Sequence, residues 1–227
     1  MTSQSTTIQN ENPRDLVNRV LRGDQDALAQ LFAVHHQRLW RMVNFRMNQR
    51  LRGRVDADDV LQEAFINASQ RMEHFLSDAS RSVFIWLRLI VSQTLVDVHR
   101  RHLMTQMRDA NREFSIQSGW SSESTSFSLS FHLLGHLTSP SQAALRVELS
   151  QQLSAALSTV TAVDREVLAL RHFEELSNSE TAQVLNMSEQ AASIRYIRAL
   201  TRLKGVMSAI PGFLDEPTSA EAVHEAS

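Results

Sequence analysis

Residues Leu176–Leu203 have the sequence LSNSETAQVLNMSEQAASIRYIRALTRL, and this stretch decides the fold of the C-terminal part of the chain. Ser177 followed three residues later by Glu180 forms the pattern of a capping box, which predicts the start of a short helix. Ser188 lies at the end of a predicted turn, residues 186–188, and is expected to cap a longer basic helix. A short capped helix, a tight turn and a longer helix have the layout of a helix-turn-helix.

The second helix of such a motif enters the DNA major groove with its N-terminal residues against base edges. Gln pairs with adenine and Glu with cytosine, whereas a row of arginines suits phosphates. The candidate DNA-contacting residues are therefore Ser188, Glu189, Gln190, Ala191, Ser193, Ile194, Arg195, Arg198 and Arg202. The residues expected to fill the core between the two helices are Leu185, Met187, Ala192, Ile197 and Leu200. A helical hairpin with a solvated arginine face is the alternative interpretation of the pattern.

Two more helices are predicted between Pro140 and the helix-turn-helix. Residues 143–157 place leucines on one stripe, and Asp164 is expected to cap the next helix. Residues 104–139 differ, because Ser121–Ser130 is mostly serine, a composition that seldom builds a core. We expect a flexible linker there. The aromatic and leucine side chains within it leave two alternatives, a docking segment or a short surface helix.

The N-terminal part of the chain predicts four amphipathic helices, which can bury one core. Asp24 or Asp26 is expected to cap the second helix, the third begins near Asp56–Asp58, and the fourth runs from about Ser82. The predicted fold class is all-α. It comprises a disordered N-terminus at 1–12, a helical domain at 13–103, the linker at 104–139, a helix-turn-helix domain at 140–210 and an acidic tail at 211–227.

Composition narrows the function classes. The chain has no cysteine, which excludes disulfides and thiolate metal sites, and no apolar run long enough to span a membrane. The polar start lacks a signal peptide, so we expect a cytoplasmic protein. Neither the histidines nor the acids form a spaced ligand or acid-base set, which predicts no cofactor and no enzyme activity. Net charge is −2, yet the basic residues, all arginine except Lys204, cluster locally.

These segments resemble, in the same order along the chain, the extracytoplasmic-function (ECF) group of the sigma-70 family of RNA polymerase sigma factors. Arg22-Gly23-Asp24-Gln25-Asp26-Ala27-Leu28 is similar to the opening signature of that group, and Asp56-x-Asp58-Asp59-Val60-x-Gln62-Glu63-x-Phe65 resembles its most specific stretch. Arg195-Tyr196-x-Arg198-Ala199-Leu200-x-Arg202-Leu203 resembles the end of its recognition helix. One departure is Gln93, where the family often has Asn.

The resemblance implies an alternative sigma factor with two conserved domains, region two and region four. It implies binding to core RNA polymerase and promoter DNA, recognition of −10 and −35 elements, help in DNA melting, and an anti-sigma factor as a further partner. Polymerase contacts would come from Asp56, Asp58, Asp59, Gln62 and Glu63. Contacts to the −10 element would come from Asp78, Ser80, Arg81, Arg88, Gln93, Arg100 and Arg101. The helix-turn-helix residues named above would contact the −35 element.

Other interpretations stay open at this point. The acids near residue 56 also suit an ordinary helix N-terminus, where they interact favourably with the helix dipole. Phe84 and Trp86 are able to stack on bases, but their helical spacing favours the core. The arginine cluster at Arg38–Arg54 has two interpretations, a solvated helix face or another contact surface. The competing functions are a one-component helix-turn-helix regulator and a helical adaptor that binds no DNA.

Overall fold

A computed structural model of the chain describes residues 13–48, 51–72, 82–103, 122–134 and 143–210. All regular secondary structure within these ranges is helical, so the predicted all-α class is confirmed. The chain divides into two compact units, residues 1–113 and residues 114–227. The boundary falls within the segment for which the sequence predicts a linker.

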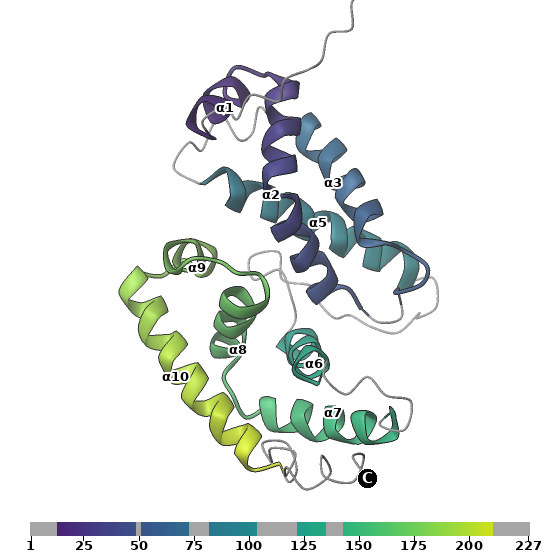
Figure 1. Ribbon diagram of the computed structural model, residues 1–227, viewed down its shortest axis with the longest axis vertical. Coiled ribbons are helices and arrows are strands. Elements are labelled where there is room, and N and C mark those ends of the chain that lie inside the picture. The colour runs from purple at the N-terminus through teal and green to yellow at the C-terminus, as the bar shows by residue number, and fades with distance from the viewer. Residues whose placement is uncertain (1–12, 49–50, 73–81, 104–121, 135–142, 211–227) are drawn as a thin grey trace, which may run out of the picture. The chain divides into compact units, whose positions relative to one another are not determined.

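Unit 1 contains α1 (Pro13–Val20), α2 (Gln25–Arg46), α3 (Ala57–Gln70) and α5 (Val83–Leu103). The long helices α2, α3 and α5 pack against one another and α1 packs on α2 (Figure 1). Asp24 caps α2, since its carboxylate accepts hydrogen bonds from the backbone N–H groups of residues 26 and 27. Asp56 caps α3. Both helices therefore begin where the sequence predicts.

The core of unit 1 forms between these three helices. Its largest fully buried side chains are Leu28, Leu31, Leu39, Met42, Leu51, Leu61, Leu87 and Leu95. The first part of α5 is buried on all sides, because every residue from Val83 to Arg88 is buried. Phe84 and Trp86 are 3% and 7% exposed, so both are core residues. The core interpretation of these two rings is the one that the structure shows.

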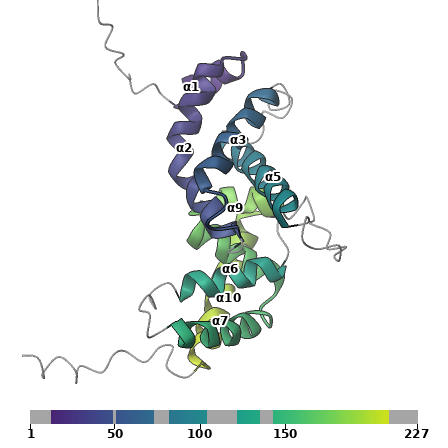
Figure 2. The ribbon, with the colours of Figure 1, turned by 90° about the vertical axis from the view of Figure 1, so that its right-hand side faces the viewer.

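The described residues of unit 2 form six helical elements, of which Figure 1 shows the last in yellow. They are α6 (Ser122–Leu133), α7 (Ala143–Leu157), α8 (Ala162–Leu168), the π-helix η2 (Ala169–Phe173), α9 (Asn178–Leu185) and α10 (Glu189–Ser208). Helix α6 packs on α7, as Figure 2 also shows, and on α8. The last helix, α10, packs on α7, α8 and α9, so α8 lies between α6 and α10 as the central element.

Two expectations need correction in unit 2. Residues 122–133 form helix α6, as the short-helix alternative has it and not the flexible linker, and Leu129 and Ser130 within it are buried. The serine-rich composition misled the prediction because this helix buries hydroxyl groups that have partners. The cap of α8 is Thr161, not Asp164: the Thr161 hydroxyl accepts the hydrogen bond from the backbone N–H of residue 164 at 3.2 Å. Asp164 instead lies in the first turn of the helix and is 2% exposed.

Candidate functional site

The helix-turn-helix of α9 and α10 is built by local hydrogen bonds. Ser177 and Glu180 form the predicted capping box of α9. Helix α9 ends at Leu185 and is capped by Asn186, which adopts the left-handed conformation with φ 51° and ψ 52°, a geometry that Asn tolerates better than most residues. The Ser188 hydroxyl then caps α10. The Asn178 amide donates to the carbonyl of Glu189 at 2.8 Å and ties the starts of the two helices together.

One face of α10 is open to solvent. Ala192 and Ala199 are buried against the rest of unit 2, and small side chains there allow close helix packing. The exposed residues from the N-terminal end are Glu189, Gln190, Ser193, Ile194, Ile197, Arg198 and Thr201. The expectation that Ile197 fills the core is wrong, since it is 61% exposed. An exposed helix face that mixes amide, hydroxyl, apolar and cationic groups has the chemistry to recognise base edges and phosphates in a major groove.

Two arginines of α10 have partners within the chain. Nη1 of Arg195 lies 3.2 Å from Oδ1 of Asp164, and Arg202 donates to the second oxygen, Oδ2, of the same carboxylate. The Asp164 side chain is 3% exposed, whereas those of Arg195 and Arg202 are 43% and 51% exposed. The ion pairs therefore join a buried acid in α8 to two half-exposed cations in α10.

The neighbouring charges of α8 are buried as well. Nη1 of Arg165 donates to the Ser126 hydroxyl of α6 at 2.5 Å and to the carbonyl of Leu157 at 3.2 Å. The Thr125 hydroxyl of α6 donates to Glu166 at 3.1 Å. Burial lowers the pKa of the Arg165 guanidinium. These contacts show why α6 is ordered: its hydroxyl groups satisfy charges that would otherwise be costly inside the unit.

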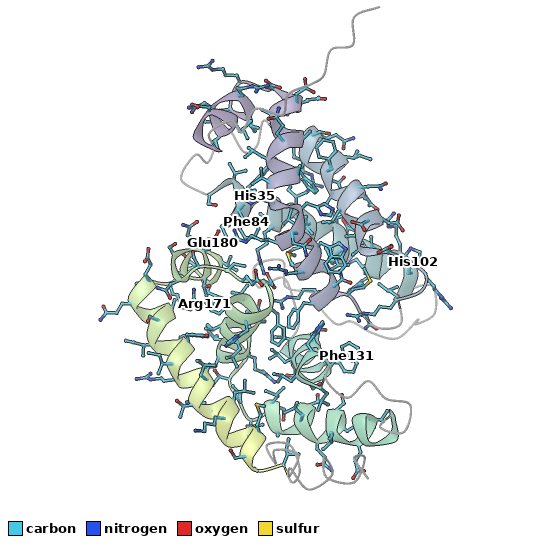
Figure 3. The ribbon with its side chains drawn as sticks, in the orientation of Figure 1. His35, Phe84, His102, Phe131, Arg171 and Glu180 are labelled. Carbon is cyan, nitrogen blue, oxygen red and sulfur yellow. The ribbon has the colours of Figure 1, made fainter. Side chains whose placement is uncertain are left out.

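A second set of contacts joins α10 to η2, the element that contains Arg171, which is labelled in Figure 3. The Tyr196 hydroxyl and Nε2 of His172 lie 3.0 Å apart, and the Arg171 guanidinium stacks over the Tyr196 ring at 5.1 Å. Arg171 also donates to the carbonyl of Leu176 at 2.9 Å, ahead of α9. Burial, together with the charge of Arg171, lowers the pKa of His172. A neutral imidazole is therefore favoured at this contact.

In unit 1 the acidic patch predicted to contact a partner begins with a capping box. Asp56 and Asp59 form that box at the start of α3, which agrees with the helix N-terminus interpretation. Asp58 lies 3.2 Å from Nε2 of His36 in α2. Further along α3, Gln62 is exposed and Glu63 is half-buried. The patch thus combines residues with a local structural role and residues that are accessible.

Glu63 has a partner on α5. Nη2 of Arg101 lies 2.6 Å from both carboxylate oxygens of Glu63, and this hydrogen bond raises the pKa of the Arg101 guanidinium. The side chains are 40% and 55% exposed, in the order Glu63 and Arg101. The sequence assigns these two residues to different partners, yet the structure joins them.

The other residues predicted for −10 contacts differ in accessibility. Arg88 is 8% exposed, so its side chain is buried. Gln93 accepts a hydrogen bond from Nη1 of Arg71 at 2.7 Å. Arg100 is exposed and lies 3.9 Å from Asp97. The remaining three, Asp78, Ser80 and Arg81, lie outside the described residues.

Three arginines of the cluster between residues 38 and 54 have structural contacts, namely Arg38, Arg46 and Arg52. The Arg38 guanidinium stacks over the Phe84 ring at 3.6 Å, close to His35, whose own ring centroid lies 5.3 Å from that of Phe84 (Figure 3). Arg46 is buried and lies over the Phe45 ring, and Arg52 donates to the carbonyl of Asn44 at 2.6 Å. Arg38 and Arg52 therefore link α2 to α5 and to the segment that follows α2, whereas Arg46 packs on its own helix.

A buried histidine lies at the far end of α5. Nε2 of His99 accepts a hydrogen bond from the backbone N–H of Asn48 at 3.3 Å, just after α2 ends. Burial lowers the pKa of His99 to about 4. The imidazole is therefore neutral at physiological pH and acts as an acceptor.

Neither a metal centre nor a membrane-spanning helix is found in the part of the chain that the structure describes. No group of three or more His, Asp or Glu side chains there is placed to hold a metal ion. None of the helices described there is long and apolar enough to cross a bilayer. The accessible features are the exposed face of α10 and the charged surface of α3 and α5.

Comparison with known proteins identifies the family. The sequence model of the ECF sigma factor family matches residues 10–206. This chain belongs to the ECF sigma factor family. It is an alternative sigma factor, a protein that directs RNA polymerase to promoters. The predicted family resemblance is confirmed.

Three curated relatives agree with the assignment. The sigma factor is 25% identical over 189 residues to the ECF RNA polymerase sigma factor SigW of Bacillus subtilis, covering 83% of this chain and 92% of SigW. It is 29% identical over 190 residues to the RNA polymerase sigma-H factor of Pseudomonas aeruginosa, with 83% and 90% covered. It is 25% identical over 202 residues to SigD of Mycobacterium tuberculosis, with 89% and 87% covered.

A solved structure has a similar fold. It is that of CnrH in complex with the cytosolic domain of CnrY. The TM-score is 0.50 at 24% sequence identity, over 88% of this sigma factor and 99% of that chain. The likeness supports the helical fold of the sigma factor.

Sequence reasoning missed the buried charges of α8 in this sigma factor. Asp164, Arg165 and Glu166 are consecutive and stand inside the apolar run from Val163 to Leu170. Three charges within an apolar run are the signal that was available, because such charges inside a domain require partners. The identity of the partners was not readable, since they lie on α6, α7 and α10.

Proposed function

We propose that this sigma factor recognises the −35 element of its promoters through the exposed face of α10. The observation that carries the proposal is the helix-turn-helix itself. Capped starts at Ser177 and Ser188 fix α9 and α10, and the N-terminal half of α10 presents Gln190, Ile194 and Arg198 to solvent. In helix-turn-helix proteins this is the half of the second helix that contacts base edges.

We propose further that unit 1 binds the −10 element and aids strand separation. Support comes from Arg100 and Arg101, which are exposed in the last turn of α5. Asp78, Ser80 and Arg81 stay predictions. A contact of Arg88 or Gln93 with DNA also stays a prediction. The first is buried and the second accepts a hydrogen bond from Arg71, so either contact requires a rearrangement.

The polymerase contact is assigned to the acidic surface of α3. Gln62 is exposed and Glu63 is accessible, so both are available to basic side chains of a partner. Asp58 is 53% exposed and adds to the same charge. Asp56 and Asp59 contribute chiefly by capping the helix that presents these side chains. Binding energy within the polymerase complex then drives melting.

The remaining parts of the proposal concern activity, location and regulation. We infer that the protein acts by binding alone, without catalysis or cofactor, and works in the cytoplasm with the polymerase. An anti-sigma factor is proposed as a further partner, in line with the structure of CnrH, which was solved with the cytosolic domain of CnrY. Co-expression with a candidate anti-sigma factor tests this partner. The expected result is that transcription is inhibited and the sigma factor is released from the core polymerase. An unchanged complex with the polymerase contradicts the proposal.

The test of the main proposal is in vitro transcription with purified core polymerase and a genomic promoter pool. We expect discrete start sites that depend on the protein. Arg198→Ala is expected to weaken transcription from these sites, whereas Lys204→Ala removes the same charge from another face of α10 and is expected to leave that transcription unchanged. Glu63→Arg is expected to abolish polymerase binding, with Gln70→Arg, at the exposed end of α3, as its control.

Two results would contradict the proposal or part of it. Tight sequence-specific binding to DNA by the protein alone, with no polymerase association, would favour the one-component regulator and overturn the proposal. Equal loss of start sites in Arg198→Ala and Lys204→Ala would show that α10 contributes only general positive charge.

A further inference from the structure

We propose that Asp164 is a positioning residue for the recognition helix α10. Its buried carboxylate holds Arg195 and Arg202, which leaves Arg198 as the arginine of this row that contacts DNA phosphates. The inference rests on the proposed function, in which α10 binds the −35 element, and assigns different roles to three arginines that the sequence treats as one row.

The geometry of the contact is that of a clamp. Each oxygen of the Asp164 carboxylate takes one arginine: Oδ1 is 3.2 Å from Nη1 of Arg195, and Oδ2 accepts from Nη1 of Arg202. The two arginines are seven residues apart, about two helical turns, so they lie almost in line along α10. One side chain of α8 thereby fixes two successive turns of α10.

Burial favours the clamp over a competing DNA phosphate. Asp164 is 3% exposed, and a carboxylate that loses its cations inside a protein has no water to replace them. The Asp164 carboxylate is also unable to move towards the surface with the arginines, because hydrogen bonds of the two residues that follow it hold α8 in place. Arg165 donates to Ser126, and Glu166 accepts from Thr125. A phosphate would therefore have to compete with a buried charge for Arg195 and Arg202.

Arg198 is in a different position. It lies between the two clamped arginines in sequence, is exposed, and has no ion-pair partner among the residues that the structure describes. It shares its helix face with Ile194 and Thr201, which are exposed at four and three residues' distance. Its charge is free to neutralise a phosphate, and that contact would release counterions on binding.

The decisive measurement is the salt dependence of DNA binding by the reconstituted holoenzyme. The probe is a labelled duplex taken from upstream of a start site found in the transcription assay. Each phosphate contact contributes roughly 0.9 to the slope of log affinity against log salt concentration. Arg198→Ala is expected to lower the slope by about 1, whereas Arg195→Ala and Arg202→Ala leave the slope unchanged and reduce the preference for the promoter over a scrambled duplex.

Asp164→Asn supplies the complementary result. It keeps the shape of the side chain and removes the charge, so the two arginines are released. The slope is then expected to rise by up to about 2, again with reduced sequence preference. Should Arg195→Ala or Arg202→Ala lower the slope as much as Arg198→Ala does, these arginines contact phosphates directly, and the inference is overturned.

A measurement without DNA separates the clamp from the proposed function. Hydrogen exchange of α10 in the full chain is expected to accelerate in Asp164→Asn, and adding Arg202→Ala to that variant is expected to change little, because the pair is already broken. Additive effects of the two substitutions would overturn the clamp alone. A different result is that the two substitutions prove coupled while the holoenzyme forms no promoter-specific complex. That result would keep the clamp but overturn the DNA contact of Arg198 together with the proposed function.

Discussion

The acidic side chain that pairs with arginines lies at the surface in unit 1 and in the interior in unit 2. Glu63 is 40% exposed and pairs with Arg101, which is 55% exposed. Asp164 is 3% exposed and pairs with Arg195 and Arg202. Among the described residues, the buried carboxylates, Asp164, Glu166 and Glu174, all belong to unit 2.

The difference teaches what each ion pair is able to do. An exposed pair is screened by water and typically contributes between 0 and about 1 kcal/mol, so it opens readily when a partner offers a better contact. Breaking a buried pair leaves an unpaired charge without solvent, and the loss of stability is several times larger than for an exposed pair. The pair in unit 1 is therefore exchangeable, and on the proposed polymerase contact Arg101 would become available when the polymerase engages Glu63. The pairs in unit 2 are structural.

The largest effect is expected when the buried acid loses both partners. Arg195→Ala combined with Arg202→Ala leaves the Asp164 carboxylate unpaired and is expected to destabilise unit 2 by about 3 kcal/mol. Hydrogen exchange of α8 and α10 in the full chain measures this loss. Adding Asp164→Leu to the double variant removes the buried charge and is expected to restore part of the stability. No change in exchange after the double substitution would contradict a structural role for these pairs.

An effect of comparable size concerns His99 of unit 1, whose burial keeps the imidazole neutral. The pKa of His99 is about 4 when folded, against 6.5 for the free side chain, so the unfolded chain binds more protons between these values. Stability is therefore full above pH 6.5 and falls as the pH drops towards 4, by about 3 kcal/mol in all.

Urea unfolding at several pH values tests the effect of His99. Trp40 and Trp86, in α2 and α5, report on unit 1 by fluorescence. His99→Gln keeps an acceptor for the Asn48 N–H and removes the titration, so its stability is expected to be flatter between pH 7 and pH 5. An equal decline in both proteins would show that other groups cause the acid sensitivity.

The smallest effect is expected for the exposed pair. Glu63→Gln removes its charge and is expected to change the stability of unit 1 by less than about 1 kcal/mol, in the same fluorescence assay. Loss of polymerase affinity without loss of stability would mark Glu63 as a contact residue. If Glu63→Gln destabilised unit 1 as much as the Arg195 and Arg202 double variant destabilises unit 2, the contrast between an exchangeable and a structural ion pair would be refuted.

Local signals predicted much of the fold. Capping residues bind the backbone of their own first turn, so Asp24, Asp56, Ser177 and Ser188 mark helix starts without reference to distant parts of the chain. The same locality explains the error at Thr161. Both Thr161 and Asp164 are good caps by type, and only the interior position of Asp164, opposite α10, decides between them.

The candidate site was predicted in part for the same reason. The exposure of Gln190 and Ile194 follows from helical periodicity alone, and so does the burial of Ala192. Periodicity misplaced Ile197, because the width of the buried stripe depends on which helices cover α10. The pairing of Glu63 with Arg101 depends on the packing of α3 against α5, which joins residues 38 positions apart in sequence.

The sequence by itself determined the helical class, most helix starts, the helix-turn-helix and the family of this sigma factor. These depend on residue type and short spacing, which act within a few turns. The tertiary structure alone decided that the serine-rich segment forms α6 on α8, and that two of three arginines in α10 have a buried partner. Charge pairing requires two groups to meet within about 4 Å, and only the folded arrangement of helices brings them that close.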